Sequence, residues 1–393
     1  MQEKLLERLS LAGLNMAPSQ VCGAIRLVPL LRRHAPGDLR LAKRSYGDDR
    51  AFVETDPTHF YSNYIPHGFV LSWGEGGAEA TVGTQLSKAD GREIKFNSAR
   101  LRLLHRMVKR EQGNQLRLLP MDLAMEGFLS LYFNGPDIAW TEYSRRFRRQ
   151  GLGSRWESVI PGNCIPGFDD ALRTFEIHEG QSGVLVFVAD TLASAFVTPC
   201  SDDYRALHQT LLEDYYGDLI YQYGLFHNGA LRLESKIVDE RVNSLADLRL
   251  ELERVRTDWA SFHGVMAGDL LGVEVKSERI YQAGVFTLQR FITNLDPKGE
   301  NHIGEAIVRN DGTLEYLKTF RLSAAQTRRA YLLGQLANAG WVLDDAAAAL
   351  QTTRHELVHR LEKAGFGYIL AEPVLIAARK HRRGPKLDRS TAY

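Results

Sequence analysis

The chain contains little cysteine and no long apolar run. Only three of its 393 residues are cysteine, and Cys22, Cys164 and Cys200 are scattered, so neither a disulfide framework nor a CxxC zinc site is expected. No run of about 18 apolar residues occurs, and the first residues indicate an amphipathic helix rather than a signal peptide. We therefore expect a cytoplasmic protein with free thiols and no membrane partner.

The sequence also lacks a catalytic signature over most of its length. The glycine cluster at 74–77 is not followed by GK[ST], and a strand rather than a helix is expected after it, so it indicates a hairpin turn and not a phosphate loop. Cys164 lies in the turn-rich segment PGNCIPG without a placed histidine, which favours an ordinary loop cysteine over a reactive thiol. We predict no catalytic residue and no cofactor, and favour a binding protein over an enzyme.

The whole chain has almost no net charge, but its C-terminal part has an excess of positive charge. The chain carries a net charge of +1, whereas residues 323–393 hold 11 Lys and Arg against 6 Asp and Glu, so residues 1–322 sum to −4. A basic tail over residues 372–393 is expected to contact phosphates without reading sequence, with a solvated, disordered terminus as the alternative. Its candidate contacts are Arg379, Lys380, Arg382, Arg383 and Lys386.

A second basic cluster interleaves four arginines with Phe147. These are Arg145, Arg146, Arg148 and Arg149. Cations alternating with an aromatic side chain suit a nucleic-acid patch. The solvated face of an amphipathic helix accounts for them equally well, so both interpretations stay open.

Residues 323–371 carry the strongest pattern, which is helical. It predicts a helix over Ala324–Ala337 ended by Gly340, an alanine-rich helix over Leu343–Leu350, and a third helix running to about Lys363. Thr353 is the expected N-cap of the third helix, with Glu356 as its capping-box partner. An apolar stripe on that helix is formed by Leu357, Val358 and Leu361.

The segment LLGQLANAGWVLDDAAAALQTTRHELVHRLEKAGF resembles the Fis-type helix-turn-helix at the end of bacterial enhancer-binding activators. The resemblance implies that the third helix enters a major groove, with double-stranded DNA as the first partner, RNA as an open alternative, and a homodimer as the binding form. Gln351 stands where the pattern usually has glycine, which costs backbone strain if its φ is positive. Such modules also serve only as packing or dimerisation units. The expected contact residues are Thr353, Arg354, His355, His359 and Arg360.

The same helix spells the zinc-peptidase motif HExxH. His355 and His359 share a face, and Glu356 could polarise a metal-bound water. Against this, Arg360 follows the second histidine directly, Gly365 stands where a metzincin would have its third histidine, and the intervening residues are already explained as helix-turn-helix core. We interpret the motif as a decoy and expect no bound metal, with a zinc metallopeptidase as the weaker alternative.

The rest of the chain predicts an α+β fold, with a β-rich domain over residues 1–150 and a mixed α+β domain over 151–322. A helix capped by Ser244 carries apolar residues at heptad spacing through Trp259, which suits either a dimer seam or packing on its own domain. The other expected elements are strands at Val21–Leu31, Gly68–Trp73, Val184–Ala189 and Ala193–Thr198, a helix at Asp202–Tyr223, and a hairpin on Asp311-Gly312.

Four segments of the chain, within residues 20–225, resemble the bacterial ARG-and-rhodanese-phosphatase-associated protein domain. They are VCGAIRLVPL, PHGFVLSWGEGGAEATVGTQL, LRLLPMDLAMEGFLSLYF and GVLVFVADTLASAFVTPCSDDYRALHQTLLEDYY. The resemblance implies gene neighbourhoods with ADP-ribosylglycohydrolases and phosphatases, and no established reaction or catalytic residue. We expect a DNA-binding regulatory or scaffold protein in stress response, repair or antiviral defence. The alternative is a hydrolase of an ADP-ribose-like or nucleotide ligand, which would need a pocket where acids such as Glu126 or Asp190 converge with other polar groups.

Overall fold

A computed structural model gives the structure of the protein. It describes residues 5–35, 39–43, 52–56, 59–62, 69–73, 78–81, 85–88, 93–94, 109–110, 116–117, 159–283, 285–364 and 366–383. The chain divides into two compact units. The first, here called the body, comprises Met1–Glu54, Ser62–Asn97 and Glu157–Ala324, and the second holds Thr55–Tyr61, Ser98–Trp156 and Ala325–Tyr393.

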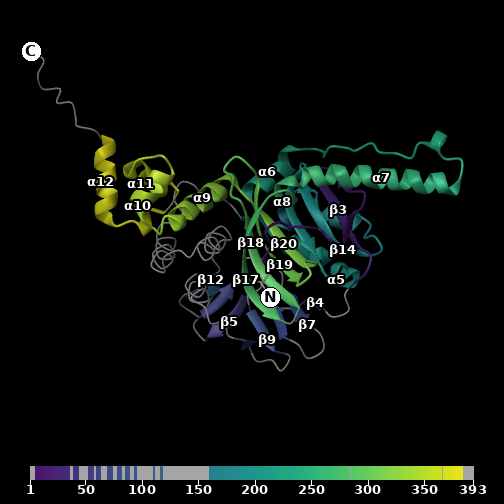
Figure 1. Ribbon diagram of the computed structural model, residues 1–393, viewed down its shortest axis with the longest axis horizontal. Helices are drawn as coiled ribbons and strands as arrows, with labels where there is room; N and C mark the ends of the chain where they lie inside the picture. Colours follow the sequence, from purple (N-terminus) through teal and green to yellow (C-terminus); the bar gives the residue numbers. More distant parts are fainter. Residues whose placement is uncertain are drawn as a thin grey trace, which may run out of the picture. The chain divides into compact units, whose positions relative to one another are not determined.

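A nine-stranded antiparallel sheet forms the centre of the body (Figure 1). Its strand order is β1-β3-β14-β15-β20-β19-β18-β17, and β2 pairs with β3 off this path. The strands are β1 Leu14–Met16, β2 Gln20–Cys22, β3 Ile25–Arg32, β14 Gln181–Val188, β15 Thr191–Val197, β17 Val275–Ala283, β18 Phe286–Thr293, β19 Asn301–Arg309 and β20 Leu314–Leu322. The sheet therefore joins strands from both ends of the body's sequence.

Both faces of this sheet are buried along the central strands β3, β14, β15, β20 and β19. One face packs its apolar residues, including Leu185, Phe291 and Leu317, against the short helix α8 (Gly268–Leu271) and the N-terminal segment around Leu9. The other face lies under a layer of helices, where Tyr204 packs beside Phe196 at a ring separation of 6.3 Å. That layer contains η1 Gly162–Cys164, α4 Phe168–Thr174, α5 Ser201–Leu207, η2 His208–Glu213 and α6 Asp218–Phe226.

The helix-covered face holds a fully buried ion pair. Lys318 on β20 contacts the Asp214 carboxylate, and the side chains of both residues are fully buried. The Lys318 ammonium lies 5.0 Å from the ring centre of Phe196 and 5.2 Å from that of Phe320. Burial lowers the pKa of Lys318, while the nearby Asp214 charge opposes that shift. The pair fastens the segment after η2 onto the sheet.

The remaining described strands form smaller sheets. A five-stranded antiparallel sheet has the order β10-β9-β8-β7-β4, and three two-stranded pairs join β5 to β6, β11 to β12 and β13 to β16. Their bounds are β4 Leu39–Lys43, β5 Phe52–Asp56, β6 His59–Ser62, β7 Phe69–Trp73, β8 Ala78–Thr81, β9 Gln85–Lys88, β10 Glu93–Ile94, β11 Lys109–Arg110, β12 Leu116–Arg117, β13 Val159–Pro161 and β16 Tyr215–Gly217. Together with the central sheet, they confirm an α+β fold with a β-rich N-terminal part.

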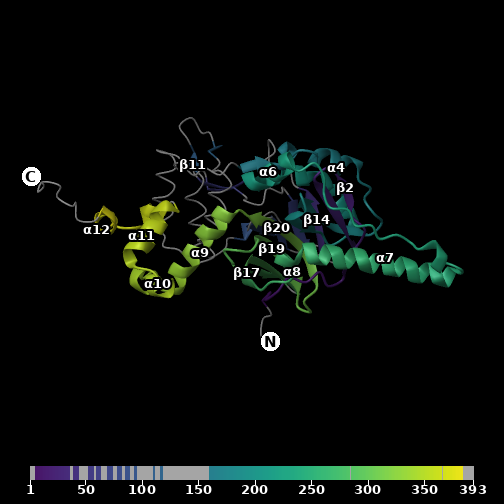
Figure 2. The same ribbon diagram turned by 90° about the horizontal axis from the view of Figure 1, so that it is seen from above.

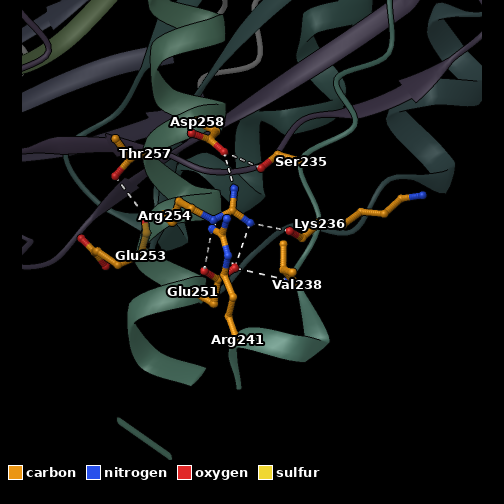
Figure 3. Close-up of polar contacts among 9 residues, drawn as sticks. All are labelled: Ser235, Lys236, Val238, Arg241, Glu251, Glu253, Arg254, Thr257 and Asp258. Atoms are coloured by element: carbon orange, nitrogen blue, oxygen red, sulfur yellow. Dashed lines mark hydrogen bonds and ion pairs between the residues drawn. The ribbon is translucent and has the colours of Figure 1, made fainter. Parts of the chain in front are cut away.

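A long helix, α7 (Leu245–Met266), runs out beyond the central sheet with residues 227–243 alongside it (Figures 1 and 2). Ser244 caps it by accepting a hydrogen bond from Asp247 N at 3.2 Å, as predicted. Figure 3 shows Arg254 of α7 joined to Glu251, to Asp258 and to the Lys236 carbonyl, which ties the outer helix to the extended segment. The one-turn helix η3 (Asp239–Arg241) lies within that segment.

Helix α7 and residues 227–243 together are here called the arm. Arg26 fastens the arm to the central sheet near Leu231. Its guanidinium is fully buried, donates to Asp190 at 3.0 Å and to Ser19 at 2.8 Å, and also contacts the Leu231 carbonyl. Asp190 in turn accepts from Leu231 N at 2.5 Å. The sequence left the role of Asp190 open, and the structure places it in this structural ion pair.

Several predicted elements need correction. The expected strand over Val21–Leu31 is two strands, because Gly23 turns the chain at φ 57°. The expected helix over Asp202–Tyr223 is wrong, since α5, η2, β16 and α6 replace it. Strand β3 hydrogen-bonds directly to β14, so a contact within the central sheet crosses the boundary expected at residue 150.

The described C-terminal residues are helical. The elements are α9 Ala324–Asn338, α10 Leu343–Ala349, α11 Arg354–Lys363, η4 Phe366–Ile369 and α12 Glu372–Arg383. Gly340 follows α9 with φ 59°, the left-handed conformation predicted for it. The predicted basic tail thus begins with a three-turn helix. None of the described helices is long and apolar enough to cross a membrane.

Candidate nucleic-acid interface

Helix α10, a tight turn and helix α11 form the core of the candidate interface. Ala346 and Ala347 are buried, as their small side chains permit close packing. The turn is closed by hydrogen bonds from Gln351 N to Ala348 O at 3.0 Å and from Thr352 N to Ala347 O at 2.9 Å. Gln351 adopts φ 51°, so the strain foreseen for a non-glycine residue at this position is present.

The start and the inner face of α11 follow the sequence prediction. The Thr353 hydroxyl accepts a hydrogen bond from Glu356 N at 3.2 Å and so caps the helix. Leu357, Val358 and Leu361 are all buried, which confirms the predicted apolar stripe. The Glu356 carboxylate contacts Arg360 one turn later at 3.4 Å.

Helix α12 packs against α11 and changes what α11 exposes. Val358 forms a small core with Leu375 and Ala378 of α12. The His359 ring hydrogen-bonds through Nε2 to the Ala378 carbonyl at 3.1 Å, and its side chain is only 12% exposed. The rings of His355 and His381 stack at 4.3 Å with an interplanar angle of 6°. Both histidines expected to face DNA therefore contact α12 instead.

This packing also bears on the HExxH motif. Nε2 of His359 is engaged by the Ala378 carbonyl, and its Nδ1 lies 3.8 Å from the Glu362 carboxylate. His355 lies flat against His381, and Glu356 contacts Arg360. Among the described residues, no group of three or more His, Cys, Asp and Glu side chains is arranged to hold a metal. The motif residues serve helix packing in this arrangement.

The exposed charges of the C-terminal helices are mostly paired. Arg354 contacts Asp344 at 2.9 Å, Arg360 contacts Glu356 at 3.4 Å, and Arg379 Nε donates to Glu362 at 3.1 Å. Lys363 and Lys380 are exposed. Arg360 is also exposed on α11, and the last two turns of α12 add further basic residues.

The other predicted contact residues are only partly placed. Arg382 and Arg383 belong to the last turn of α12, where the structure describes the backbone but not these side chains. Lys386 and the second basic cluster of Arg145, Arg146, Arg148 and Arg149 lie outside the described residues.

Sequence reasoning missed α12 and the acidic partners of the arginines. A usable signal was present, because Pro373 suits the first turn of a helix and Val374, Leu375 and Ala378 follow at helical spacing. The basic residues masked this pattern by suggesting a solvated tail. Asp344 and Glu362 gave no local signal, since their partners are 10 and 17 residues away.

The body contains a cavity of about 810 Å³ in the part of the chain that the structure describes. It lies between the N-terminal segment and the β17–β20 end of the sheet, and Arg8, Arg279, Arg309 and Glu274 contribute to its lining. Arg8 and Glu274 form an exposed ion pair at 3.5 Å. No histidine is among its described lining residues, so the converging acids and histidines expected of a hydrolase are not found there.

Comparison with known proteins gives a family for most of the chain. A model of the ARPP-2 family matches residues 9–284, which is 276 of the 393 residues, so the chain belongs to the ARPP-2 (ARG and rhodanese-phosphatase-associated protein) family. This confirms the resemblance found over residues 20–225 and extends it through α7. The match ends before β18 and the C-terminal helices. Searches of curated proteins and of solved structures found no match.

Proposed function

We propose that this member of the ARPP-2 family is a nucleic-acid-binding regulatory or scaffold protein, with α10, α11 and α12 as the binding module and double-stranded DNA as the first partner. The observation that carries the proposal is the excess of basic residues in the C-terminal helices. Residues 325–383 hold nine Lys and Arg against five Asp and Glu, whereas residues 1–322 are net negative. Such an imbalance favours binding of a polyanion to the C-terminal helices.

The packing of α12 supports contacts with the phosphate backbone rather than base reading. In helix-turn-helix proteins the N-terminal residues of the recognition helix contact base edges. Here Arg354 at that position is paired with Asp344, and His355 is stacked on His381. Arg360, which pairs with Glu356, is exposed together with Lys363 and Lys380, and phosphate contacts carry no sequence information. The proposed binding is therefore tolerant of sequence.

The α+β body supports the regulatory or scaffold part of the proposal. Its buried charged groups, such as Arg26 with Asp190 and Lys318 with Asp214, fasten structural elements to one another. A body of this kind joined to a nucleic-acid module fits a role in stress response, repair or antiviral defence, with a homodimer as the binding form. The hydrolase and zinc-peptidase alternatives have weaker support, since the described cavity and the HExxH residues lack the arrangements they need.

Truncation tests the proposal. A chain ending at Ser323 is expected to lose binding to a fluorescent 20-base-pair duplex and to single-stranded RNA, as measured by anisotropy at low salt. Its body should stay folded, because the central sheet ends with β20 at Leu322. Circular dichroism provides the control. Equal affinity of the truncated and full-length chains for both probes would contradict the proposal.

A further inference from the structure

Three arginines of the C-terminal helices are each paired with a carboxylate of the same module. Arg354 pairs with Asp344 of α10 at 2.9 Å, and their side chains are 46% and 62% exposed. Within α11, Arg360 pairs with Glu356 at 3.4 Å. The third pair joins α12 to α11: Arg379 of α12 donates to Glu362 of α11 from both Nε and Nη2.

The Arg354 and Arg379 pairs join different helices, so they are more than neighbouring charges along one helix. Asp344 is 10 residues from Arg354, and Glu362 is 17 residues from Arg379. Each carboxylate accepts the guanidinium hydrogen bonds that a phosphate oxygen would accept, since arginine binds both groups with the same donor geometry. A backbone phosphate at either position must therefore displace a carboxylate or lie beside it.

Building on the proposed function, we propose that Asp344 and Glu362 form a carboxylate brake on nucleic-acid binding. The two acids occupy the guanidinium groups of Arg354 and Arg379 in the unbound protein. Exposed ion pairs of this kind are weak and are screened by salt. A dense row of phosphates can displace them, whereas an isolated anion competes poorly. The brake therefore lowers affinity and favours long polyanionic partners over single phosphates.

The chain supplies a matched control for this inference. Asp344 and Asp345 are neighbours in the first turn of α10, and both are exposed. Asp345 has no ion pair among the residues that the structure describes. Asp344→Asn and Asp345→Asn change the net charge of the module equally, and both remove an acid from the same helix N-terminus. Only the first releases an arginine.

The experiment compares full-length protein, Asp344→Asn, Glu362→Gln and Asp345→Asn for binding to a fluorescent 20-base-pair duplex at 50 mM salt. The brake predicts that Asp344→Asn and Glu362→Gln each raise affinity about threefold to tenfold, whereas Asp345→Asn raises it less than about twofold. The gain should shrink at 200 mM salt, because exposed charges are screened. Circular dichroism verifies that each variant is folded.

The outcomes separate the two proposals. If the full-length protein binds and Asp344→Asn gains no more than Asp345→Asn, the brake is wrong and the proposed function stands. Binding by Asp344→Asn or Glu362→Gln where the wild type does not bind supports the brake in its strongest form. If neither the wild type nor any folded variant binds the duplex or an RNA of equal length, the proposed function fails and the brake fails with it.

Discussion

Two histidines of the body are buried in surroundings that disfavour their charged form. His302 is fully buried and hydrogen-bonds to the Leu192 carbonyl at 3.1 Å, and burial lowers its pKa to about 4. His263 packs beside Trp259 and Phe262, and neither of its ring nitrogens has a hydrogen-bond partner among the described residues. Burial, reinforced by the Arg26 charge, lowers the pKa of His263 to about 4. Both rings are neutral at pH 7 in the folded protein.

These histidines predict a loss of stability in mild acid. Their pKa in the folded state lies below the unfolded value of about 6.5, so between those values the unfolded chain binds more protons. The free energy of unfolding should therefore fall as pH drops from about 6.5 to 4, by up to about 1.4 kcal/mol per pH unit for each fully buried histidine. Urea unfolding at several pH values measures the slope.

A substitution isolates the part due to His263. His263→Phe retains an aromatic ring of similar size and removes the two unpartnered nitrogens. The variant should be at least as stable as the wild type at pH 5 and should show a smaller dependence of stability on pH. His227→Phe, at an exposed position, serves as the matched control. If the free energy of unfolding of His263→Phe depended on pH as steeply as that of the wild type, this account of the buried ring would be wrong.

At the scale of elements, the sequence predicted correctly the hairpin turn and the helix starts that depend on interactions between neighbouring residues. The Asp311-Gly312 hairpin formed as expected, with Gly312 at φ 91°. The Ser244 cap placed the start of α7, and the Thr353 cap placed the start of α11. These features depend on residues within a few positions of one another, so the sequence displays them directly.

The failed prediction of a helix over Asp202–Tyr223 shows the limit of local signals. Tyr215 and Tyr216 belong to β16, which pairs with β13 more than 50 residues earlier. Asp214 is held by Lys318, 104 residues later in the chain. Removing one partner of such a buried pair commonly costs about 3–5 kcal/mol, so this contact outweighs the helix propensity of the segment. Nothing near Asp214 in the sequence reveals its partner.

The contacts of Arg254 predict how tightly the extended segment is held against α7. Arg254 joins α7 to the extended segment through the Lys236 carbonyl, and its neighbour Glu251 accepts a hydrogen bond from Val238 N at 3.3 Å (Figure 3). Arg254→Ala should speed amide hydrogen exchange over residues 233–238, because the carboxylate that receives Val238 N loses its main positioning contact. The melting temperature of the protein should change little, since the network lies outside the main core.

Arg256→Ala is the matched control for this prediction. Arg256 lies two residues along the same helix, is more exposed, and contacts only Glu253 among its described ion-pair partners, at 3.8 Å. Its removal should leave exchange over residues 233–238 unchanged. Equal exchange in the two variants would show that the Arg254 network does not fasten the segment.

At the scale of the whole molecule, the sequence shows the charge division directly, and its domain boundaries stay predictions. The expected boundary at residue 323 lies beside the division of the two units at Ala324. The pairing of β3 with β14 crosses the expected boundary at residue 150, and no composition change in the sequence marks this long-range contact. The helical content of the C-terminal part followed from local patterns, whereas the contacts of α12 with His355 and His359 required the structure.

The central claim is that the C-terminal helices bind nucleic acid through phosphates. Its most direct test is the affinity of the full-length protein for a 20-base-pair duplex between 50 and 200 mM salt, measured beside Arg360→Gln/Lys363→Gln. About four phosphate contacts predict a fall of about a hundredfold over that range, with a clearly shallower slope in the double variant. A flat dependence, or an equal slope in both proteins, would contradict the claim.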